Sequence, residues 1–352
     1  MTYTHCGEVA QVCLNGIIGL LSNLRKFFLV LLVLPFLAEP ALARILYVDA
    51  NSRGGSGSAD APFKSINQAA QIARPGDTIL VRRGIYSGHV KVYKNGRPGA
   101  PIVIKGERGA VIDGSRTRVD TLVEIGGSHV VFEGFEVRNA SRTGIGLWGT
   151  FHSVVRKNTV VGSQGAGIWV GHSQRGRSGQ NLVEQNVIFD NCRMNIARKR
   201  TSGWPIGIAI AVSDQSIVRS NTVYENHGEG IGVLSSSNVK VHNNTVYDNF
   251  SVNIYLDNAP NSYVQANTIG STGNRTFFRH QRPPAGVLIA NERTRHQMAS
   301  RGIKVVSNSL IGVEDVSYGT YGVNSGLHNS VIAPNKVQST RWLVPPRGTP
   351  GS

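Results

Sequence analysis

The chain has 352 residues, of which 40% are apolar and 16% are charged, and it contains 41 glycines and 14 prolines. These proportions exclude collagen-like, disordered and coiled-coil proteins. Lysine and arginine together number 37, against 21 aspartates and glutamates, which gives a net charge of +16. Such an excess favours a polyanionic partner: nucleic acid, an anionic lipid surface or an acidic polysaccharide.

The first residues have the pattern of a secretory signal peptide. Arg25 and Lys26 precede an apolar run over 27–37, and Ala41-Leu42-Ala43 matches an A-x-A cleavage signal. That run has about 11 residues, whereas a membrane-spanning helix needs about 20. We therefore expect residues 1–43 to be removed and the protein to be secreted or periplasmic. No second run of spanning length follows, so no stable membrane insertion is expected after cleavage, and export argues against a nucleic acid partner.

An asparagine recurs through the second half of the chain, at Asn158, Asn186, Asn221, Asn244, Asn267 and Asn308. A valine stands three residues before each of them, and Val, Ile or Leu stands two residues after. Aliphatic pairs with a spacing of two also precede these asparagines, at Ile145/Leu147, Ile168/Val170, Ile208/Ile210, Ile231/Val233, Ile254/Leu256 and Val287/Ile289. A period of two predicts strands with these side chains facing inward.

A unit of about 23 residues with three short strands predicts one coil of an all-β fold, the right-handed parallel β-helix. Stacked asparagine amides can hydrogen-bond along such a solenoid, so Asn221 and Asn244 are expected to be buried and within reach of each other. A second column just before the inward pairs is expected to meet a requirement for positive φ; it consists of Gly144, Gly167, Gly207, Gly230, Asn253 and Gly286.

The two ends of the repeat region complete the expected organisation. Residues 62–73 carry apolar side chains at helical spacing and are followed by Pro75-Gly76, which predicts a helix capping the open N-terminal edge of the solenoid. Residues 78–82, 89–93 and 102–105 follow as the first strands. We expect a signal peptide over 1–43, the cap and first coils over 44–114, β-helix repeats over 115–340 and a loose tail over 341–352, in a monomeric protein.

Several N-terminal segments resemble a known family: Tyr47-Val48-Asp49, Pro62-Phe63-Lys64-Ser65, Pro75-Gly76-Asp77-Thr78, Arg83-Gly84-Ile85-Tyr86 and Val111-Ile112-Asp113-Gly114. Over 46–114 the chain resembles exported pectate-lyase-like β-helix proteins and is most similar to family nine polysaccharide lyases. The resemblance implies action on polysaccharide, with the site on the first parallel sheet and the loops that enter it. It also implies a lyase chemistry, in which Ca²⁺ or basic side chains neutralise a uronate and Lys or Arg removes the C5 proton.

Repeats longer than 23 residues predict loops at 172–180, 191–205, 271–285 and 292–302. The second and third of these precede strands of one sheet and are basic, so we expect them to flank a cleft for an acidic polysaccharide. The candidate ligands of substrate carboxylates are Arg198, Arg200, Arg279 and Arg282. The alternative is that these are ordinary solvated loops.

Large aromatic and very small residues alternate on the outward face of the same sheet. Trp148, Trp169 and Tyr255 suit stacking on the apolar faces of sugars, and Asp257 shares this face. The alternative is that loops cover these rings as ordinary packing.

The candidate general base is Lys199, because Arg198 and Arg200 on either side disfavour its charged form. His227 and Glu229 are the candidate acid and its orienting partner. A solvated loop lysine and a turn histidine without a role are the alternatives.

A calcium site of the family-nine kind is not predicted. The acidic candidates Asp214, Glu229 and Asp257 occupy different positions along the strands of their coils. Glu229 and Asp257 are offset by five residues along the strand direction, or ~17 Å, which is too far for both to bind one ion. Ca²⁺ dependence is left open. The sequence also lacks the Asp-Asp pair of polygalacturonases and the Asp-Pro-His-Asp signature of epimerases. We therefore expect a lyase for a uronate-containing polysaccharide, or alternatively a non-catalytic polysaccharide-binding or periplasmic accessory protein.

Overall fold

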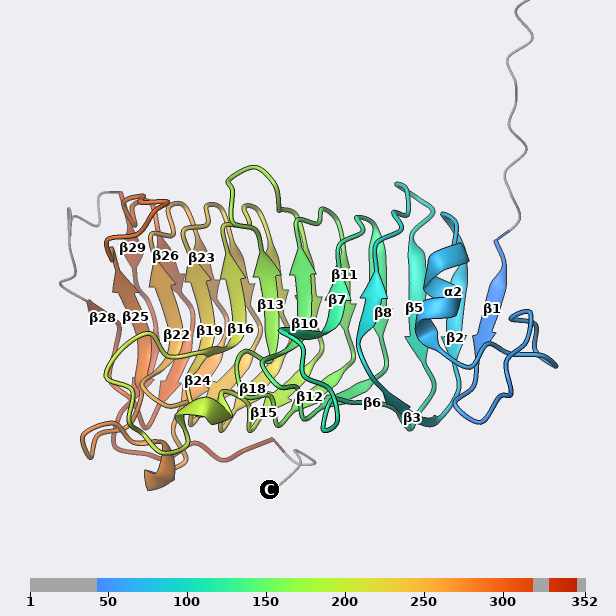
Figure 1. The fold of residues 1–352 in the computed structure, drawn as a ribbon. Helices are drawn as coiled ribbons and strands as arrows, with labels where there is room; N and C mark the ends of the chain where they lie inside the picture. The colour runs from blue at the N-terminus through green and yellow to red at the C-terminus, as the bar shows by residue number, and fades with distance from the viewer. Residues whose placement is uncertain (1–42, 319–328, 347–352) are drawn as a thin grey trace, which may run out of the picture. The chain divides into compact units, whose positions relative to one another are not determined.

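The described part of the chain folds into three parallel sheets through which it passes repeatedly in the same order (Figure 1). The computed structural model describes residues 43–318 and 329–346, so the predicted signal peptide and the end of the predicted tail lie outside it. Sheets A, B and C have 11, 10 and 9 strands. Every strand pair is parallel and joins one coil to the next, which confirms the predicted all-β solenoid. Within these residues, no helix has both the length and the apolar character to span a bilayer.

The strands are short, as expected for coils of about 23 residues. Sheet A contains β1 (Ile45–Val48), β2 (Thr78–Val81), β5 (Ile102–Gly106), β8 (Val130–Glu133), β11 (Val154–Arg156), β14 (Leu182–Glu184), β17 (Ile217–Arg219), β20 (Lys240–His242), β23 (Tyr263–Gln265), β26 (Lys304–Val306) and β29 (Val331–Ile332). Sheet B contains β3 (Gly84–Ser87), β6 (Ala110–Asp113), β9 (Glu136–Arg138), β12 (Thr159–Val161), β15 (Val187–Phe189), β18 (Thr222–Tyr224), β21 (Thr245–Tyr247), β24 (Thr268–Gly270), β27 (Ser309–Ile311) and β30 (Lys336–Gln338). Sheet C contains β4 (Val90–Val92), β7 (Thr121–Ile125), β10 (Thr143–Trp148), β13 (Ile168–Gly171), β16 (Ile206–Ala211), β19 (Glu229–Leu234), β22 (Val252–Asp257), β25 (Ala285–Ala290) and β28 (Ser317–Tyr318).

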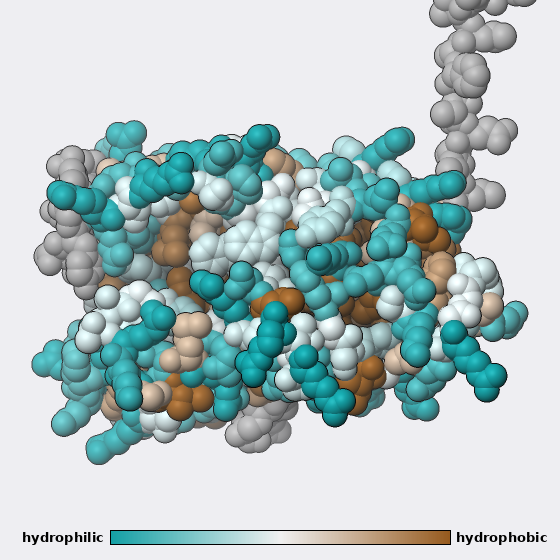
Figure 2. All heavy atoms as spheres, in the orientation of Figure 1, coloured by the Kyte–Doolittle hydropathy of each residue, from teal (hydrophilic) through white to brown (hydrophobic). Residues whose placement is uncertain are grey.

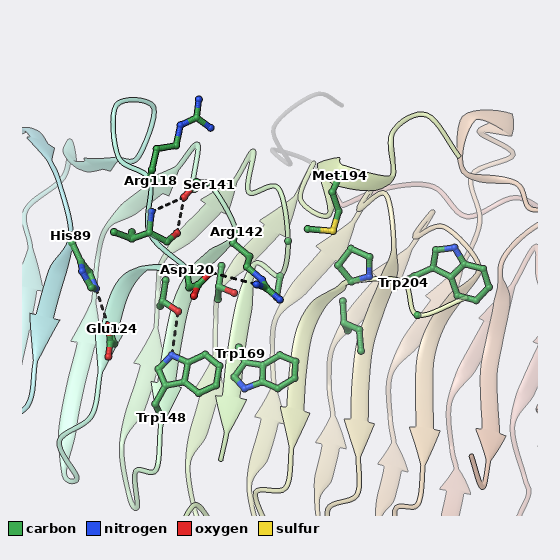
Figure 3. A pocket seen from close by; sticks show the side chains of 18 of the residues that line it. His89, Arg118, Asp120, Glu124, Ser141, Arg142, Trp148, Trp169, Met194 and Trp204 are labelled. Atoms are coloured by element: carbon green, nitrogen blue, oxygen red, sulfur yellow. Dashed lines mark hydrogen bonds and ion pairs between the residues drawn. The ribbon is translucent and has the colours of Figure 1, made fainter. Parts of the chain in front are cut away.

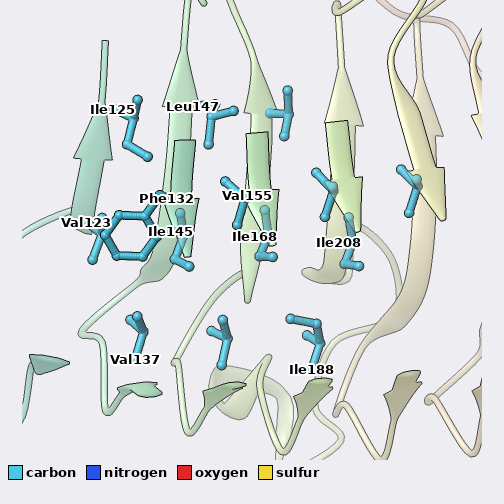
Figure 4. Close-up of a cluster of buried hydrophobic side chains, with 14 of the residues drawn as sticks. Val123, Ile125, Phe132, Val137, Ile145, Leu147, Val155, Ile168, Ile188 and Ile208 are labelled. Carbon is cyan, nitrogen blue, oxygen red and sulfur yellow. The ribbon is translucent and has the colours of Figure 1, made fainter. Parts of the chain in front are cut away.

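The core consists of aliphatic columns that run along the solenoid (Figure 4). In sheet A, Val183 is in register with Val218, and Val218 with Val241. In sheet C, Ile208, Ile231 and Ile254 form the equivalent column. All these side chains are fully buried. The inward register predicted from the period-two pattern is therefore confirmed.

The recurrent asparagines form a buried ladder at the turn between sheets A and B. Asn221 Nδ2 donates to Asn244 Oδ1 at 3.0 Å, and both residues are buried, as predicted. The same bond repeats along Asn158, Asn186, Asn221, Asn244, Asn267, Asn308 and Asn335. A second, unpredicted ladder runs through Asn191, Asn226, Asn249 and Asn253 at the turn between sheets B and C. Amide side chains thus satisfy one another where the chain turns away from its sheets.

The glycine column before the strands of sheet C has a different cause from the one predicted. None of its glycines has a positive φ, so that expectation is wrong. A Cβ added to Gly144 would instead lie 2.7 Å from both Gly167 O and Val160 Cγ1. The column is glycine because the backbone passes close to the inner wall of the coil, and Asn253, at the same position, points into the second ladder.

The predicted capping helix is present as α2 (Ile66–Ile72). A capping box of Ser65 and Gln68 begins it, and it packs against β1, β2 and β4. Asn67 Nδ2 donates to the carbonyl of His89, and Asn67 Oδ1 accepts from the N–H of Lys91, both at 2.8 Å. The helix therefore satisfies backbone groups at the edge of β4 as a neighbouring strand would.

Part of the tail that was predicted to be loose packs on sheet B. Leu343 is buried against Tyr224 and Tyr247, and its N–H donates to the carbonyl of Ser271 at 2.8 Å. The prediction of a loose tail therefore does not hold at Leu343, because the stacked rings of Tyr224 and Tyr247 on sheet B offer it an apolar surface. The face drawn in Figure 2 is mostly hydrophilic, with apolar side chains exposed in small separate areas.

Candidate functional site

Loops leave both edges of sheet C at the positions that the repeat intervals predict. Loops 192–205 and 271–284 precede β16 and β25, whereas loops 172–181 and 291–303 follow β13 and β25. A further loop, 114–120, precedes β7. It was not predicted, because the asparagine anchors begin only at Asn158.

The two basic loops contact each other. Arg198 Nη2 donates to the carbonyl of Thr276 at 2.9 Å, and its guanidinium lies 4.2 Å from the centre of the Phe250 ring. The Arg279 guanidinium lies 4.4 Å from the Trp204 ring centre. The interpretation of a cleft between these loops is therefore wrong, because cation–π contacts hold them together over the sheet.

An open cleft of about 1230 Å³ lies instead on the N-terminal side of loop 192–205, with residues from β7, β10, β13 and β16 in its lining. Trp148 and Trp169 line it, with ring centres 5.8 Å apart and planes inclined by 23° (Figure 3). Trp148 Nε1 donates to Thr121 Oγ1 at 3.2 Å, whereas Trp169 Nε1 is buried without a hydrogen-bond partner. Two of the three predicted aromatic residues are thus brought together in the cleft.

Arginines line this cleft on both sides of the tryptophan pair. Arg118 and Arg142 lie just before β7 and β10, and Arg200 comes from loop 192–205. Arg142 lies 3.4 Å from Asp120, but both side chains are largely exposed, so the pair adds little stability. Arg200 donates to the carbonyl of Gly203 at 2.9 Å. All three arginines therefore line the cleft, and only Arg200 among them was predicted.

His89 and Glu124 line the same cleft, at the end near α2. Glu124 Oε1 accepts from the hydroxyl of Tyr93 at 2.5 Å, and His89 Nε2 lies 2.9 Å from Glu124 Oε2. The hydrogen bond to Glu124 and partial burial raise the pKa of Tyr93 to about 12. Sequence reasoning missed this cluster, although carrying the register of sheet C back to β7 places Glu124 on the outward face, two strands from Trp169.

A second group of acidic residues is enclosed rather than open. Glu229, Tyr255 and Asp257 are each no more than 6% exposed. Tyr255 donates its hydroxyl hydrogen to Glu292 Oε1 at 2.8 Å, and the N–H of Glu292 donates to Asp257 Oδ1 at 2.6 Å. Burial, with the charges of Glu292 and Asp257 in support, raises the pKa of Glu229 to about 8. Burial likewise raises the pKa of Asp257 to about 6. Tyr255 and Asp257 are therefore packed and do not form part of the open floor.

Two family comparisons cover nearly all of the described chain. A model of the Pel9A-like right-handed β-helix region matches residues 46–204, and a model of the right-handed β-helix region matches residues 195–341. The chain is a right-handed parallel β-helix protein. Its N-terminal part, residues 46–204, is similar to the Pel9A-like β-helix region, as the motifs over 46–114 indicated.

Solved structures resemble this β-helix at low sequence identity. Pectate lyase Pel9A is 18% identical, with 83% of this chain and 79% of that chain covered and a TM-score of 0.52. A double mutant of the periplasmic alginate epimerase AlgG is 13% identical, with 75% and 61% covered and a TM-score of 0.55. XylC in complex with xylose is 12% identical, with 78% and 70% covered and a TM-score of 0.52. These likenesses show the fold alone. No curated protein matches the sequence significantly.

The three predicted catalytic residues of the β-helix do not form one site. Lys199 is exposed on loop 192–205, whereas Glu229 is buried in sheet C. His227 Nε2 lies 3.1 Å from Asp190 Oδ1, and its ring packs on Phe277. Of the remaining predicted residues, Arg279 and Arg282 line a separate hollow beside loop 271–284. The sequence spacing correctly placed these residues near one sheet, but in the structure they do not share one accessible surface.

Among the described residues, the candidate acidic side chains do not fit a family-nine-like calcium site. Glu229 is opposite Ile206 and Asp257 is opposite Leu234, so the two carboxylates keep the lateral offset expected from the sequence. Over residues 43–318 and 329–346, no group of three or more His, Cys, Asp or Glu side chains is placed to hold a metal ion. No chemical step is therefore assigned to Ca²⁺.

Proposed function

We propose that this β-helix protein is exported and that it binds an acidic polysaccharide in the open cleft and cleaves it by β-elimination. The observation that carries the proposal is the stacked pair of Trp148 and Trp169 in an open cleft that is also lined by arginines. Flat aromatic rings suit the apolar faces of sugar units, and guanidinium groups bind carboxylates through paired hydrogen bonds.

The charge of the cleft favours an acidic over a neutral polysaccharide. Three arginines line it, against the carboxylates of Asp120 and Glu124. The net charge of +16 adds long-range attraction for a polyanion. Uronate units combine the two chemistries that the cleft offers, because each has an apolar sugar face and a carboxylate.

A non-catalytic binding protein is the second candidate. The observation in its favour is that the sequence-predicted acid and base residues are not together: Glu229 is enclosed, and Lys199 is exposed on a loop. Such a protein would use the same tryptophans and arginines, so binding alone does not distinguish the two candidates.

The test combines binding and cleavage on one panel of polymers. Purified protein is incubated with pectate, alginate and glycosaminoglycans, with and without chelator, while calorimetry reports binding and ultraviolet absorbance reports unsaturated product. We expect binding to at least one uronate polymer and release of unsaturated ends. Trp169→Ala should weaken binding, whereas the control Trp342→Ala, outside the cleft lining, should not. Binding without unsaturated ends contradicts the lyase, and no binding to any polyanion contradicts the cleft.

A further inference from the structure

Three side chains from the first coils of sheet C are joined at one end of the cleft, and Figure 3 shows two of them, His89 and Glu124. Glu124 lies on β7, and His89 and Tyr93 lie directly before and after β4. One oxygen of the Glu124 carboxylate contacts His89 and the other contacts Tyr93. Because sheet C is parallel and β4 is paired with β7, this grouping is fixed by the register of the strands and not by a loop.

The backbone beneath Tyr93 is shaped for its ring. A Cβ added to Gly126 would lie 2.6 Å from Tyr93 Cδ1, so the ring lies directly over this glycine. Tyr93 is 55% exposed, yet its hydroxyl is held against Glu124. Its phenolic proton is therefore kept beside the cleft and stays on the oxygen at neutral pH.

His89 is held differently. Its Nε2 is buried 2.9 Å from Glu124 Oε2, but the N–H direction is poor and Nε2 has no hydrogen-bond partner. With a carboxylate facing Nε2, the tautomer protonated at Nε2 leaves Nδ1 as the basic nitrogen. This tautomer can take up a proton.

We infer that His89 and Tyr93 are the catalytic base and acid of the cleft and that Glu124 positions both of them. This inference rests on the proposed lyase function and assigns its chemistry to residues other than Lys199, His227 and Glu229. His89 and Glu124 line the cleft together with Trp148, and Tyr93 is hydrogen-bonded to Glu124, so a sugar stacked on Trp148 would lie next to this cluster.

The step that these residues would carry out is balanced without a cofactor. The C5–H bond of a uronate unit breaks, and its proton passes to the His89 imidazole. The electron pair forms the C4=C5 double bond, the C4–O4 bond breaks, and O4 takes the phenolic proton of Tyr93. Proton return from His89 to Tyr93 through solvent restores the enzyme.

The test separates chemistry from binding with matched variants. His89→Gln and Tyr93→Phe remove one proton-transfer group each, while His152→Gln and Tyr263→Phe alter a histidine and a tyrosine that neither line the cleft nor contact Glu124. Each protein is tested on the polymer that wild type cleaves, with kcat and KM from product absorbance and Kd from calorimetry. We expect kcat to fall about 10²- to 10⁴-fold in the first pair with Kd within about threefold of wild type, and no change in the controls. Glu124→Gln should also lower kcat more than it changes Kd.

The possible outcomes distinguish this inference from the proposed function. If wild type cleaves and both cleft variants retain their kcat, the acid–base assignment is wrong while the lyase proposal stands. If wild type binds but produces no unsaturated ends, both the assignment and the lyase proposal fail and a binding protein is left. Circular dichroism spectra matching wild type would show that lost activity does not come from misfolding.

Discussion

Replacing Asn221 by alanine should destabilise the solenoid more than its small loss of volume suggests. Asn221 is buried in the middle of the ladder, where its Nδ2 donates to Asn244 Oδ1 and to two backbone carbonyls. Its Oδ1 accepts from both the backbone N–H and the Nδ2 of Asn186. The substitution therefore removes five hydrogen bonds from one buried turn.

The cost is dominated by the groups that lose their partners. The buried backbone N–H of Asn186 donates to the Asn221 side chain and loses this acceptor in the variant. An unsatisfied buried donor costs about 1–3 kcal/mol. The other lost bonds add about 0.5–1.5 kcal/mol each where no replacement forms, although Asn186 Nδ2 also donates to the carbonyl of Val155. We expect the free energy of unfolding to fall by about 3–5 kcal/mol in total.

The assay is urea unfolding followed by circular dichroism, with amide hydrogen exchange to locate the effect. Exchange is needed because repeat proteins can open locally around a weakened coil. Asn335→Ala is the comparison: Asn335 ends the described ladder, is less buried and makes three hydrogen bonds instead of five, so its loss should be smaller, about 1–3 kcal/mol. Equal midpoints for Asn221→Ala and wild type, with unchanged exchange at residues 183–188, would refute the energetic role of the ladder.

Three further predictions concern the core, the cleft and pH. Val218→Asp places an unpaired charge at a fully buried position and should cost several kcal/mol; a melting temperature equal to that of wild type would contradict the inward register. Trp169→Ala should weaken polysaccharide binding at any salt concentration, whereas Arg142→Ala with Arg200→Ala should weaken it mainly at low ionic strength, which calorimetry at two salt concentrations can separate. Because the pKa of Glu229 is about 8 in the folded protein and near 4.5 when unfolded, the unfolded chain releases its proton first, and stability should fall as pH rises from about 5 to 8. Glu229→Gln should reduce that slope in thermal melts, and an unchanged slope would show that Glu229 titrates normally.

The coils could be predicted from the sequence because each one repeats the same requirements. Val218 and Asn221 recur at fixed offsets, since every coil must fill the same interior and turn at the same place. The glycine column was also visible, but its cause was not. Close approach of Gly144 to Gly167 O depends on the distance between coils, which a single repeat does not reveal.

The site was harder to predict, because it depends on loops and on coils without the asparagine anchor. The cation–π contact of Arg198 with Phe250 joins residues about fifty positions apart, and it turns a predicted carboxylate ligand into a structural residue. His89 and Glu124 lie in coils before Asn158, where the repeat was not extended. Trp148 and Trp169 were predicted correctly as outward residues, because the period-two register alone decides which face they occupy.

Loops 114–120, 172–181, 192–205, 271–284 and 291–303 all leave the solenoid at the edges of sheet C, outside the strands that define its coils. An insertion or deletion within the exposed stretch 199–203 of loop 192–205 should therefore change the surface and leave the inward side chains of the strands in place. Variation in substrate preference among such proteins can then arise by changes of loop length and sequence, while the coils that carry the loops keep their structure. Trp148, Trp169 and Glu124 sit on strands, and His89 and Tyr93 directly flank one, so they would persist through such changes. Arg200 of loop 192–205 would be the first contact to be gained or lost.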